Sequence, residues 1–199
     1  MKEGLFIVIY GANNLGKSVQ AEKLVESFKK AGLKAELIKY PIYDLKPTGP
    51  KINEILRSGK KQPFSEEEFQ KLYAQNRLDF QPQLCKKICD GINVVSECYI
   101  GTGLAWGWTK GADIEKLIEI NKGLVEPDIA IVLDGERFVE GKEETHQHES
   151  NDKWWEECRL NFIKLAARFG WEVVEANQIV EKVHQDILKI IEEKVRLID

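Results

Sequence analysis

The chain has 199 residues, of which 43% are hydrophobic and 31% are charged, a composition typical of one globular domain with its own core. Its net charge of −4 argues against a nucleic-acid partner and favours an enzyme that meets small anions at a local site. No apolar run is long enough to span a membrane and no signal peptide precedes the first apolar run, so we expect a cytoplasmic protein without membrane contact. Four cysteines without a C-x-x-C pair indicate reduced thiols rather than a zinc site.

The first predicted strand leads into a glycine-rich turn. The apolar run 5–10 is followed by G-x-x-x-x-G-K-S over 11–18, and then by apolar residues at helical spacing until Gly32. Backbone N–H groups in such a turn and the following helix N-terminus point at phosphate oxygens. We expect Lys17 to reach the β- and γ-phosphates of ATP and Ser18 to hold Mg²⁺. The expected ATP-binding residues are Gly11, Asn13, Asn14, Leu15, Gly16, Lys17, Ser18 and Val19.

The middle of the chain alternates between predicted strands and predicted helices. A strand over 35–40 precedes a turn-rich loop and a helix that begins at Pro50 and ends at Gly59. Ser65 and Glu68 have the spacing of a capping box, so a helix begins there, and a separate helix is predicted over 82–90. A strand over 92–97 then leads to a predicted loop over 98–111, which holds four glycines and two tryptophans.

The last third supplies the remaining strands and helices. The segment 135–152 is charged and nearly free of aliphatic residues, which predicts a mobile lid or a surface loop. Around it, helices are predicted near Ile114 and over 154–169 and 179–197, with strands over 129–134 and 171–175. Strands that alternate with helices predict the α/β class. We expect a single domain over 1–199, a doubly wound three-layer sandwich with a five-stranded parallel sheet.

Ligands of such a sheet bind outside the C-terminal strand ends, so the loops after Tyr10, Tyr40, Glu97 and Asp134 should meet in one cleft. Glu97 is placed to hold Mg²⁺ or position an acceptor, with a solvated strand-end carboxylate as the alternative. Tyr73 and Arg77 share a helix face and could hold a flat base, or could be a core ring and a surface charge.

Two patterns remain open. Trp106 either walls a base or caps the core. His146 and His148 form only a weak metal-binding pattern in the predicted lid.

The order and spacing of these motifs resemble the thymidylate kinase family of nucleoside monophosphate kinases over nearly the whole chain. Residues 40–43 are similar to the family's F-P-x-R, 73–77 to its F-x-A-N-R, and 97–106 to its D-R-Y-x-x-S-x-x-A-Y. The resemblance implies a P-loop kinase that moves the γ-phosphoryl group of ATP, with Mg²⁺, to dTMP or a related pyrimidine nucleotide, and it implies a homodimer. The site residues that it implies are Lys17, Glu97 and Arg137 for catalysis, Ser18 and Glu97 for the metal, and Tyr40, Tyr43, Tyr73, Arg77, Tyr99 and Trp106 for the acceptor.

Three positions depart from the family pattern. Tyr43 and Cys98 stand where the family has arginines that grip the acceptor phosphate, and Asn13 replaces an acidic residue that contacts the 3′-hydroxyl. A tyrosine cannot replace a permanently charged, bidentate guanidinium. Either other cations hold that phosphate, with Lys46, Lys51, Lys110 or a lid residue as candidates, or the acceptor differs. A deoxynucleoside kinase, a kinase of another small acceptor and a non-catalytic ATP-binding relative therefore stay open.

Overall fold

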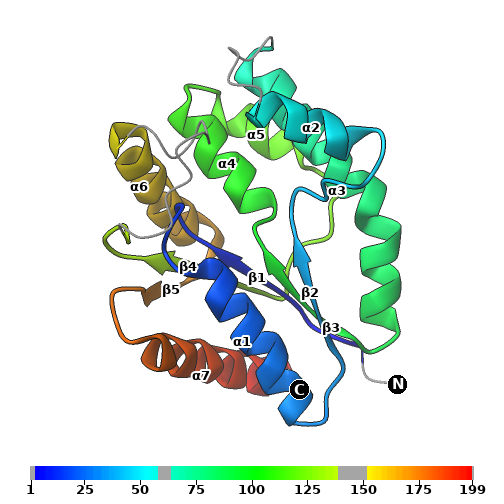
Figure 1. The fold of residues 1–199 in the computed structure, drawn as a ribbon, viewed down its shortest axis with the longest axis vertical. Helices are drawn as coiled ribbons and strands as arrows, with labels where there is room; N and C mark the ends of the chain where they lie inside the picture. Colours follow the sequence, from blue (N-terminus) through cyan, green and yellow to red (C-terminus); the bar gives the residue numbers. More distant parts are fainter. Residues whose placement is uncertain (1–2, 58–63, 139–151, 199) are drawn as a thin grey trace.

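The computed structural model describes residues 3–57, 64–138 and 152–198, in which five parallel strands form one sheet between two layers of helices (Figure 1). The strand order is β2-β3-β1-β4-β5: the chain passes from β1 to the edge strand β2, returns to β3 beside β1, and then continues to β4 and β5 on the other side. The predicted fold class, a doubly wound α/β sheet, is confirmed. The strands are β1 (Phe6–Tyr10), β2 (Ala35–Lys39), β3 (Asn93–Glu97), β4 (Ile129–Asp134) and β5 (Glu172–Glu175).

Each strand of the sheet centre is buried on both faces. In β1, Phe6 and Val8 face one core cluster while Ile7 and Ile9 face the other. The first cluster is covered by α3 (Glu66–Cys89), α4 (Ile100–Thr109), α5 (Ile114–Ile120) and most of α6 (Asp152–Phe169), and the second by α1 (Lys17–Lys30) and α7 (Val180–Ile198). Two-sided burial explains why β1 reads as an unbroken apolar run rather than an alternating one.

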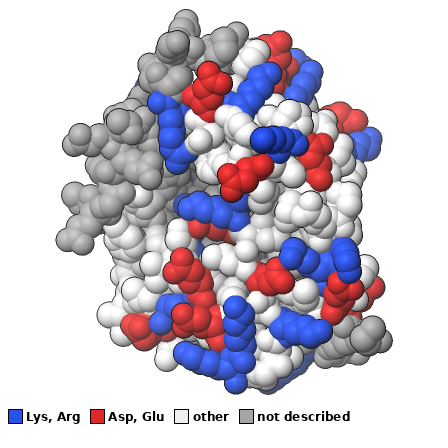
Figure 2. All heavy atoms as spheres, turned by 45° about the vertical axis from the view of Figure 1, so that its right-hand side comes forward, with Lys and Arg blue, Asp and Glu red and all other residues white. Residues whose placement is uncertain are grey.

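The surface carries both signs of charge. On the face seen in Figure 2, Lys and Arg side chains stand beside Asp and Glu side chains, as the modest net charge of −4 leads us to expect. Within the described ranges, no helix is both long and apolar enough to cross a membrane.

One continuous helix, α3, replaces the two helices predicted over 65–90. Its predicted capping box is confirmed, because Ser65 Oγ accepts from the Glu68 backbone N–H and the Glu68 carboxylate accepts from the Ser65 N–H. The predicted break at Pro82 is wrong, since Pro82 lies inside the helix. A proline removes one helical hydrogen bond, but Leu84 beyond it is fully buried, and this packing carries the helix onward.

The predicted loop over 98–111 is also wrong: α4 fills most of it. Its glycines are there for close packing rather than for a flexible loop. A Cβ at Gly101 would lie 2.7 Å from the Trp171 ring, and one at Gly103 would lie 2.6 Å from Gln70 Oε1. A side chain at Gly101 would push α4 away from the packed Trp171 and Tyr10 rings, and one at Gly103 would force the end of the Gln70 side chain to shift.

The helix α2 (Thr48–Arg57) begins two residues before the predicted Pro50, and its predicted end at Gly59 lies outside the described residues. Its apolar side chains Ile52, Ile55 and Leu56 pack on Phe69 of α3. The helix is thereby fixed beside the C-terminal edge of the sheet.

His184 joins the two helices that cover the second core cluster. Its Nε2 lies 2.8 Å from Ser27 Oγ of α1, and the imidazole is 9% exposed. Burial, helped by the nearby Lys23 charge, lowers the pKa of His184 below its ordinary 6.5. The folded chain therefore holds this ring neutral at pH values where the unfolded chain protonates it.

This pKa shift predicts a loss of stability in mild acid. The contribution is fully present above pH 6.5 and falls as the pH drops below that value, because only the unfolded state then binds the proton. We expect the urea midpoint of His184→Gln to fall less than that of the wild type between about pH 7.5 and 5.5. Equal pH slopes for the two proteins would contradict the assignment.

Candidate active site

A cavity of about 430 Å³ opens at the C-terminal ends of β1, β2 and β3. Three of the four loops expected to meet there, after β1, β2 and β3, contribute to it, and so do α2, α3 and α4. Of the loop after Asp134, the structure describes residues 135–138, and none of these four lines it. The predicted site residues that line it are Asn13, Asn14, Gly16, Lys17, Ser18, Val19, Tyr40, Tyr43, Tyr73, Arg77, Glu97, Tyr99 and Trp106.

The phosphate-binding loop is built from residues that tolerate unusual backbone angles. Gly11, Asn14 and Gly16 have φ values of 136°, 61° and 79°. These turns bring successive backbone N–H groups to the start of α1, which is the geometry that attracts phosphate oxygens. Lys17 lies across the loop, with its Nζ donating to the Ala12 carbonyl at 2.7 Å.

Two expected ATP-binding residues serve the fold of this loop. Leu15 is 1% exposed and packs in the second core cluster. A Cβ at Gly11 would lie 2.6 Å from the Leu133 carbonyl oxygen, so only glycine fits there. Gly11 has no side chain and that of Leu15 does not line the cavity, so only their backbone atoms are available for ATP.

Glu97 and Ser18 form an oxygen site beside this loop. Ser18 Oγ donates to Glu97 Oε2 at 2.8 Å, and Lys39 Nζ lies 3.1 Å from Glu97 Oε1. Glu97 is only 6% exposed, so it is not a solvated strand-end carboxylate. Burial acts to lower the pKa of Lys39, but the Glu97 charge raises it above its ordinary value. A hydroxyl and a carboxylate are the hard oxygen ligands that Mg²⁺ takes, so these residues fit the ion.

Arg77 is buried, and it lines the side of the cavity opposite the phosphate-binding loop. It is therefore not a surface charge. Its Nη1 donates to Asn121 Oδ1 at 2.8 Å and its Nη2 to the Tyr99 carbonyl at 3.0 Å. Burial lowers the pKa of Arg77 from its usual high value, and the guanidinium stays charged. With Tyr73 on the same helix face, it presents a fixed planar group to the cavity.

Asn76, one residue before Arg77, holds the loop between β2 and α2. Its Oδ1 accepts from the Ile42 N–H at 2.8 Å, and its Nδ2 donates to the Ile42 carbonyl at 3.0 Å and to Thr48 Oγ1 at 2.9 Å. From the sequence, Asn76 was only one position of the 73–77 motif, with no role of its own. The contacts give it a structural task, which is to keep Tyr40 and Tyr43 against the cavity.

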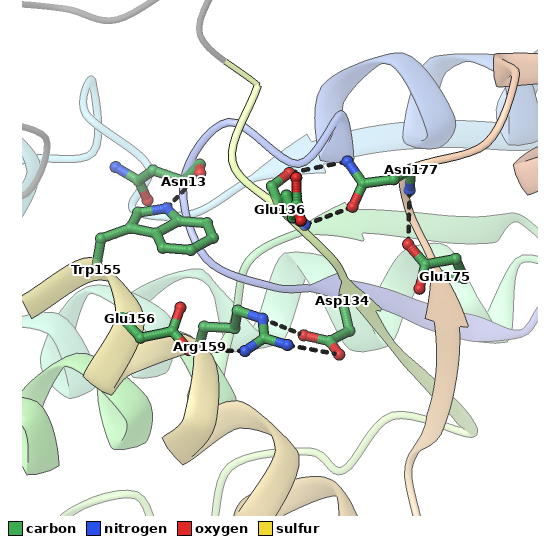
Figure 3. A network of polar contacts seen from close by, with 8 residues as sticks. All are labelled: Asn13, Asp134, Glu136, Trp155, Glu156, Arg159, Glu175 and Asn177. Carbon is green, nitrogen blue, oxygen red and sulfur yellow. Dashed lines mark hydrogen bonds and ion pairs between the residues drawn. The ribbon is translucent and has the colours of Figure 1, made fainter. Parts of the chain in front are cut away.

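The helix α6 is attached to the phosphate-binding loop and to the end of β4 (Figure 3). The Trp155 indole N–H donates to the Asn13 carbonyl at 2.7 Å, and Arg159 Nε lies 2.9 Å from Asp134 Oδ1. Figure 3 also shows Asn177 bridging Glu136 and Glu175 at the ends of β4 and β5. The α6 N-terminus, which directly follows the predicted lid, is therefore fixed to the nucleotide-binding side of the molecule.

The predicted lid lies largely outside the described residues, and so do His146 and His148. Arg137 is described: its Nη1 lies 3.2 Å from Asp152 Oδ1, and its guanidinium carbon lies 5.9 Å from the Trp155 ring centroid. It is not among the residues that line the cavity, and its catalytic role stays a prediction.

Two cations of the cavity were missed from the sequence. Lys39 is the last residue of β2, where the strand-end rule could have found it, but Arg57 ends α2 with no local signal. The lysines expected instead lie elsewhere: Lys110 pairs with Glu66 at 3.5 Å, and Lys51 sits over the Phe64 ring. Other lining residues that the sequence did not indicate are Pro41, Leu56, Gln70, Thr102 and Gly103.

Comparison with known proteins agrees with the expected family. A family model described as thymidylate kinase matches residues 9–187. The chain belongs to the thymidylate kinase family. It is 32% identical to a protein named probable thymidylate kinase of Thermococcus onnurineus, over 96% of this chain and 98% of that one. It is 28% identical to the human protein named thymidylate kinase, over 98% and 93% of the two chains.

A solved relative shares the fold. The thymidylate kinase structure from Candida albicans covers 96% of this chain with a TM-score of 0.82, at 22% identity. It therefore supports the architecture alone. The thymidylate kinase family membership rests on the sequence matches.

Replacing Asn76 should damage both stability and the acceptor side. Asn76→Ala leaves the part-buried Ile42 N–H without its partner and removes the hydrogen bonds to the Ile42 carbonyl and Thr48 Oγ1, which costs roughly 1–3 kcal/mol of unfolding free energy. We expect a lower urea midpoint, and a KM that rises more for the acceptor than for ATP. The control is Gln75→Ala on the same helix, whose exposed side chain donates to Asp79. A loss as large in the control would contradict the role given to Asn76.

Proposed function

We propose that the protein transfers the γ-phosphoryl group of ATP to dTMP or a closely related pyrimidine nucleoside monophosphate, forming the diphosphate. The observation that carries this proposal is one cavity lined by the phosphate-binding loop on one side and by Tyr73 and Arg77 on the other. Donor and acceptor nucleotides would thus bind side by side in one cavity. Membership of the thymidylate kinase family supports this choice of acceptor.

Catalysis of this transfer is mainly positioning and electrostatics. Lys17 and the loop N–H groups bind the donor phosphates, with the Lys17 ammonium moving from the Ala12 carbonyl to phosphate oxygens. Ser18 and Glu97 hold Mg²⁺, which when bound neutralises part of the phosphate charge. An oxygen of the acceptor phosphate attacks the γ-phosphorus and ADP leaves, so no strong general base is required.

The acceptor base lies against Tyr73 and Arg77 in the same proposal. Asn121 and the Tyr99 carbonyl hold the guanidinium plane, so the base meets an oriented group rather than a flexible one. Trp106, which is 4% exposed, closes this end of the cavity against water. Arg137 and the segment 135–152 complete the site as a lid over the donor phosphates.

The cellular setting belongs to the same proposal. A cytoplasmic location gives the enzyme access to ATP and nucleoside monophosphates. The homodimer implied by the family resemblance is measured directly by light scattering of the purified chain.

A nucleoside kinase is the second candidate, because Tyr43 and Cys98 both line the cavity without adding positive charge. Burial raises the pKa of the Cys98 thiol, so it stays protonated at neutral pH. An acceptor without a phosphate would place less demand on this part of the cavity.

The deciding experiment follows ADP formation from Mg-ATP with dTMP, dUMP, thymidine and other monophosphates. We expect dTMP to raise the rate far above the ATPase background. Thymidine turnover without dTMP turnover would move the assignment to a nucleoside kinase. No acceptor-dependent ADP at all would mark a non-catalytic ATP-binding relative.

The role of Lys17 is tested in the same assay. Lys17→Ala should lower the transfer rate by about a hundredfold or more, because it removes a cation from the charge of the transferring group. The control is Lys23→Ala on the same helix, where Lys23 pairs with Glu181 at 3.3 Å outside the cavity. An unchanged rate in Lys17→Ala would remove the loop from the mechanism.

A further inference from the structure

The cavity carries more positive than negative charge. Among the described residues that line it, the cations are Lys17, Lys39, Arg57 and Arg77, and the one carboxylate is Glu97. Lys17 belongs to the phosphate-binding loop, and both Nη atoms of Arg77 already donate to protein oxygens. Lys39 and Arg57 are the cations that this assignment of roles leaves unexplained.

Lys39 has donor capacity beyond its contact with Glu97. An ammonium has three N–H bonds, and the Lys39 side chain is 60% exposed with one contact to Glu97. Glu97 uses its other oxygen for Ser18. The Glu97 carboxylate thus lies between the Ser18 hydroxyl and the Lys39 ammonium. Since Ser18 is on the ATP side, Lys39 is on the side of the acceptor.

Arg57 is oriented by an aromatic ring. Its guanidinium carbon lies 5.2 Å from the Tyr43 ring centroid, while its Nη1 donates to Asn53. This cation–π contact restrains the guanidinium and leaves other N–H bonds of the fork available for a phosphate. Burial raises the pKa of Tyr43, while the Arg57 charge, a hydrogen bond with the Arg57 side chain and the Lys39 charge act to lower it.

We propose that Lys39 and Arg57 bind the phosphate of the acceptor nucleotide and that the Tyr43 ring positions Arg57. This inference rests on the proposed function and names the residues that select a phosphorylated acceptor. An acceptor phosphate bound by Lys39 and Arg57 lies next to Glu97. The donor phosphates bind on the other side of that carboxylate, at Ser18 and Lys17. Tyr43 itself supplies no charge, and it acts as the platform for the guanidinium.

The test compares two ligands that differ only in the phosphate. Binding of dTMP and of thymidine is measured by calorimetry without ATP or Mg²⁺, on the wild type, Lys39→Gln, Arg57→Gln and the control Lys51→Gln. Lys51 is on the same helix as Arg57 and does not line the cavity. We expect each of the first two variants to lose roughly tenfold to a hundredfold in dTMP affinity with thymidine affinity unchanged, and the control to lose neither.

Three results would overturn the inference. One is a wild type that binds dTMP no more tightly than thymidine. Another is dTMP affinity unchanged in Lys39→Gln and Arg57→Gln. The third is an equal loss for both ligands, which would mean that these residues support the shape of the cavity and not the phosphate.

The positioning role of Tyr43 has its own variants. Tyr43→Phe keeps the ring and loses only the hydroxyl that meets Arg57, so it should retain most of the dTMP affinity, whereas Tyr43→Ala should lose about as much as Arg57→Gln. The double variant Tyr43→Ala/Arg57→Gln should lose little more than either single variant, because the ring acts through the guanidinium. Fully additive losses would show that Tyr43 acts independently of Arg57.

Turnover of dTMP by the wild type separates this inference from the proposed function. A wild type that phosphorylates dTMP while the variants bind it unchanged overturns only the roles of Lys39 and Arg57. A wild type that binds dTMP through these cations but transfers no phosphoryl group overturns the proposed catalysis and leaves the binding site standing.

Discussion

The carboxylate of Glu97 joins the two halves of the cavity. It ends β3, which lies between β1 and β2, and the strand register pairs it with Ile9 on one side and Lys39 on the other. Parallel pairing therefore brings the residues that follow β1 and those that end β2 to the same carboxylate. Ser18 meets one oxygen and Lys39 the other. The hydrogen bonds between three neighbouring strands thus set how far the phosphate-binding loop, with Lys17 and Ser18, lies from Lys39.

A second set of constraints comes from buried side-chain amides. Asn76 attaches the β2–α2 loop to α3, and Asn121, at the end of α5, fixes Arg77. Each amide offers a donor and an acceptor, so it can satisfy backbone groups that would be costly to bury alone. On the other side, Trp155 and Arg159 attach α6 to the Asn13 carbonyl and to Asp134. The loops around the cavity are held by elements that are themselves packed in the core.

The sequence predicted most where the signal is local. The glycine-rich turn, the capping box at Ser65 and the apolar strands are encoded over a few residues, and the structure contains all three. Prediction was wrong where distant contacts override local preference, as at Pro82 inside α3 and at the glycines of α4. Arg57 illustrates the limit for the site, because its place in the cavity depends on how α2 packs on Phe69 and on the Tyr43 ring. The spacing of residues along the sequence does not reveal these tertiary contacts of Arg57.

The contact between Lys17 and Ala12 has a consequence for how nucleotide affinity is to be understood. The ammonium already has an acceptor within its own loop, at 2.7 Å and with the lysine only 7% exposed. In the proposed mechanism the ammonium moves from that carbonyl to phosphate oxygens, so binding exchanges one hydrogen bond for another. The contribution of Lys17 to nucleotide affinity is then the difference between the two bonds, and it is larger for a phosphate than for a neutral ligand, because hydrogen bonds between charged groups are stronger. Lys17 thus favours phosphorylated ligands whatever base they carry.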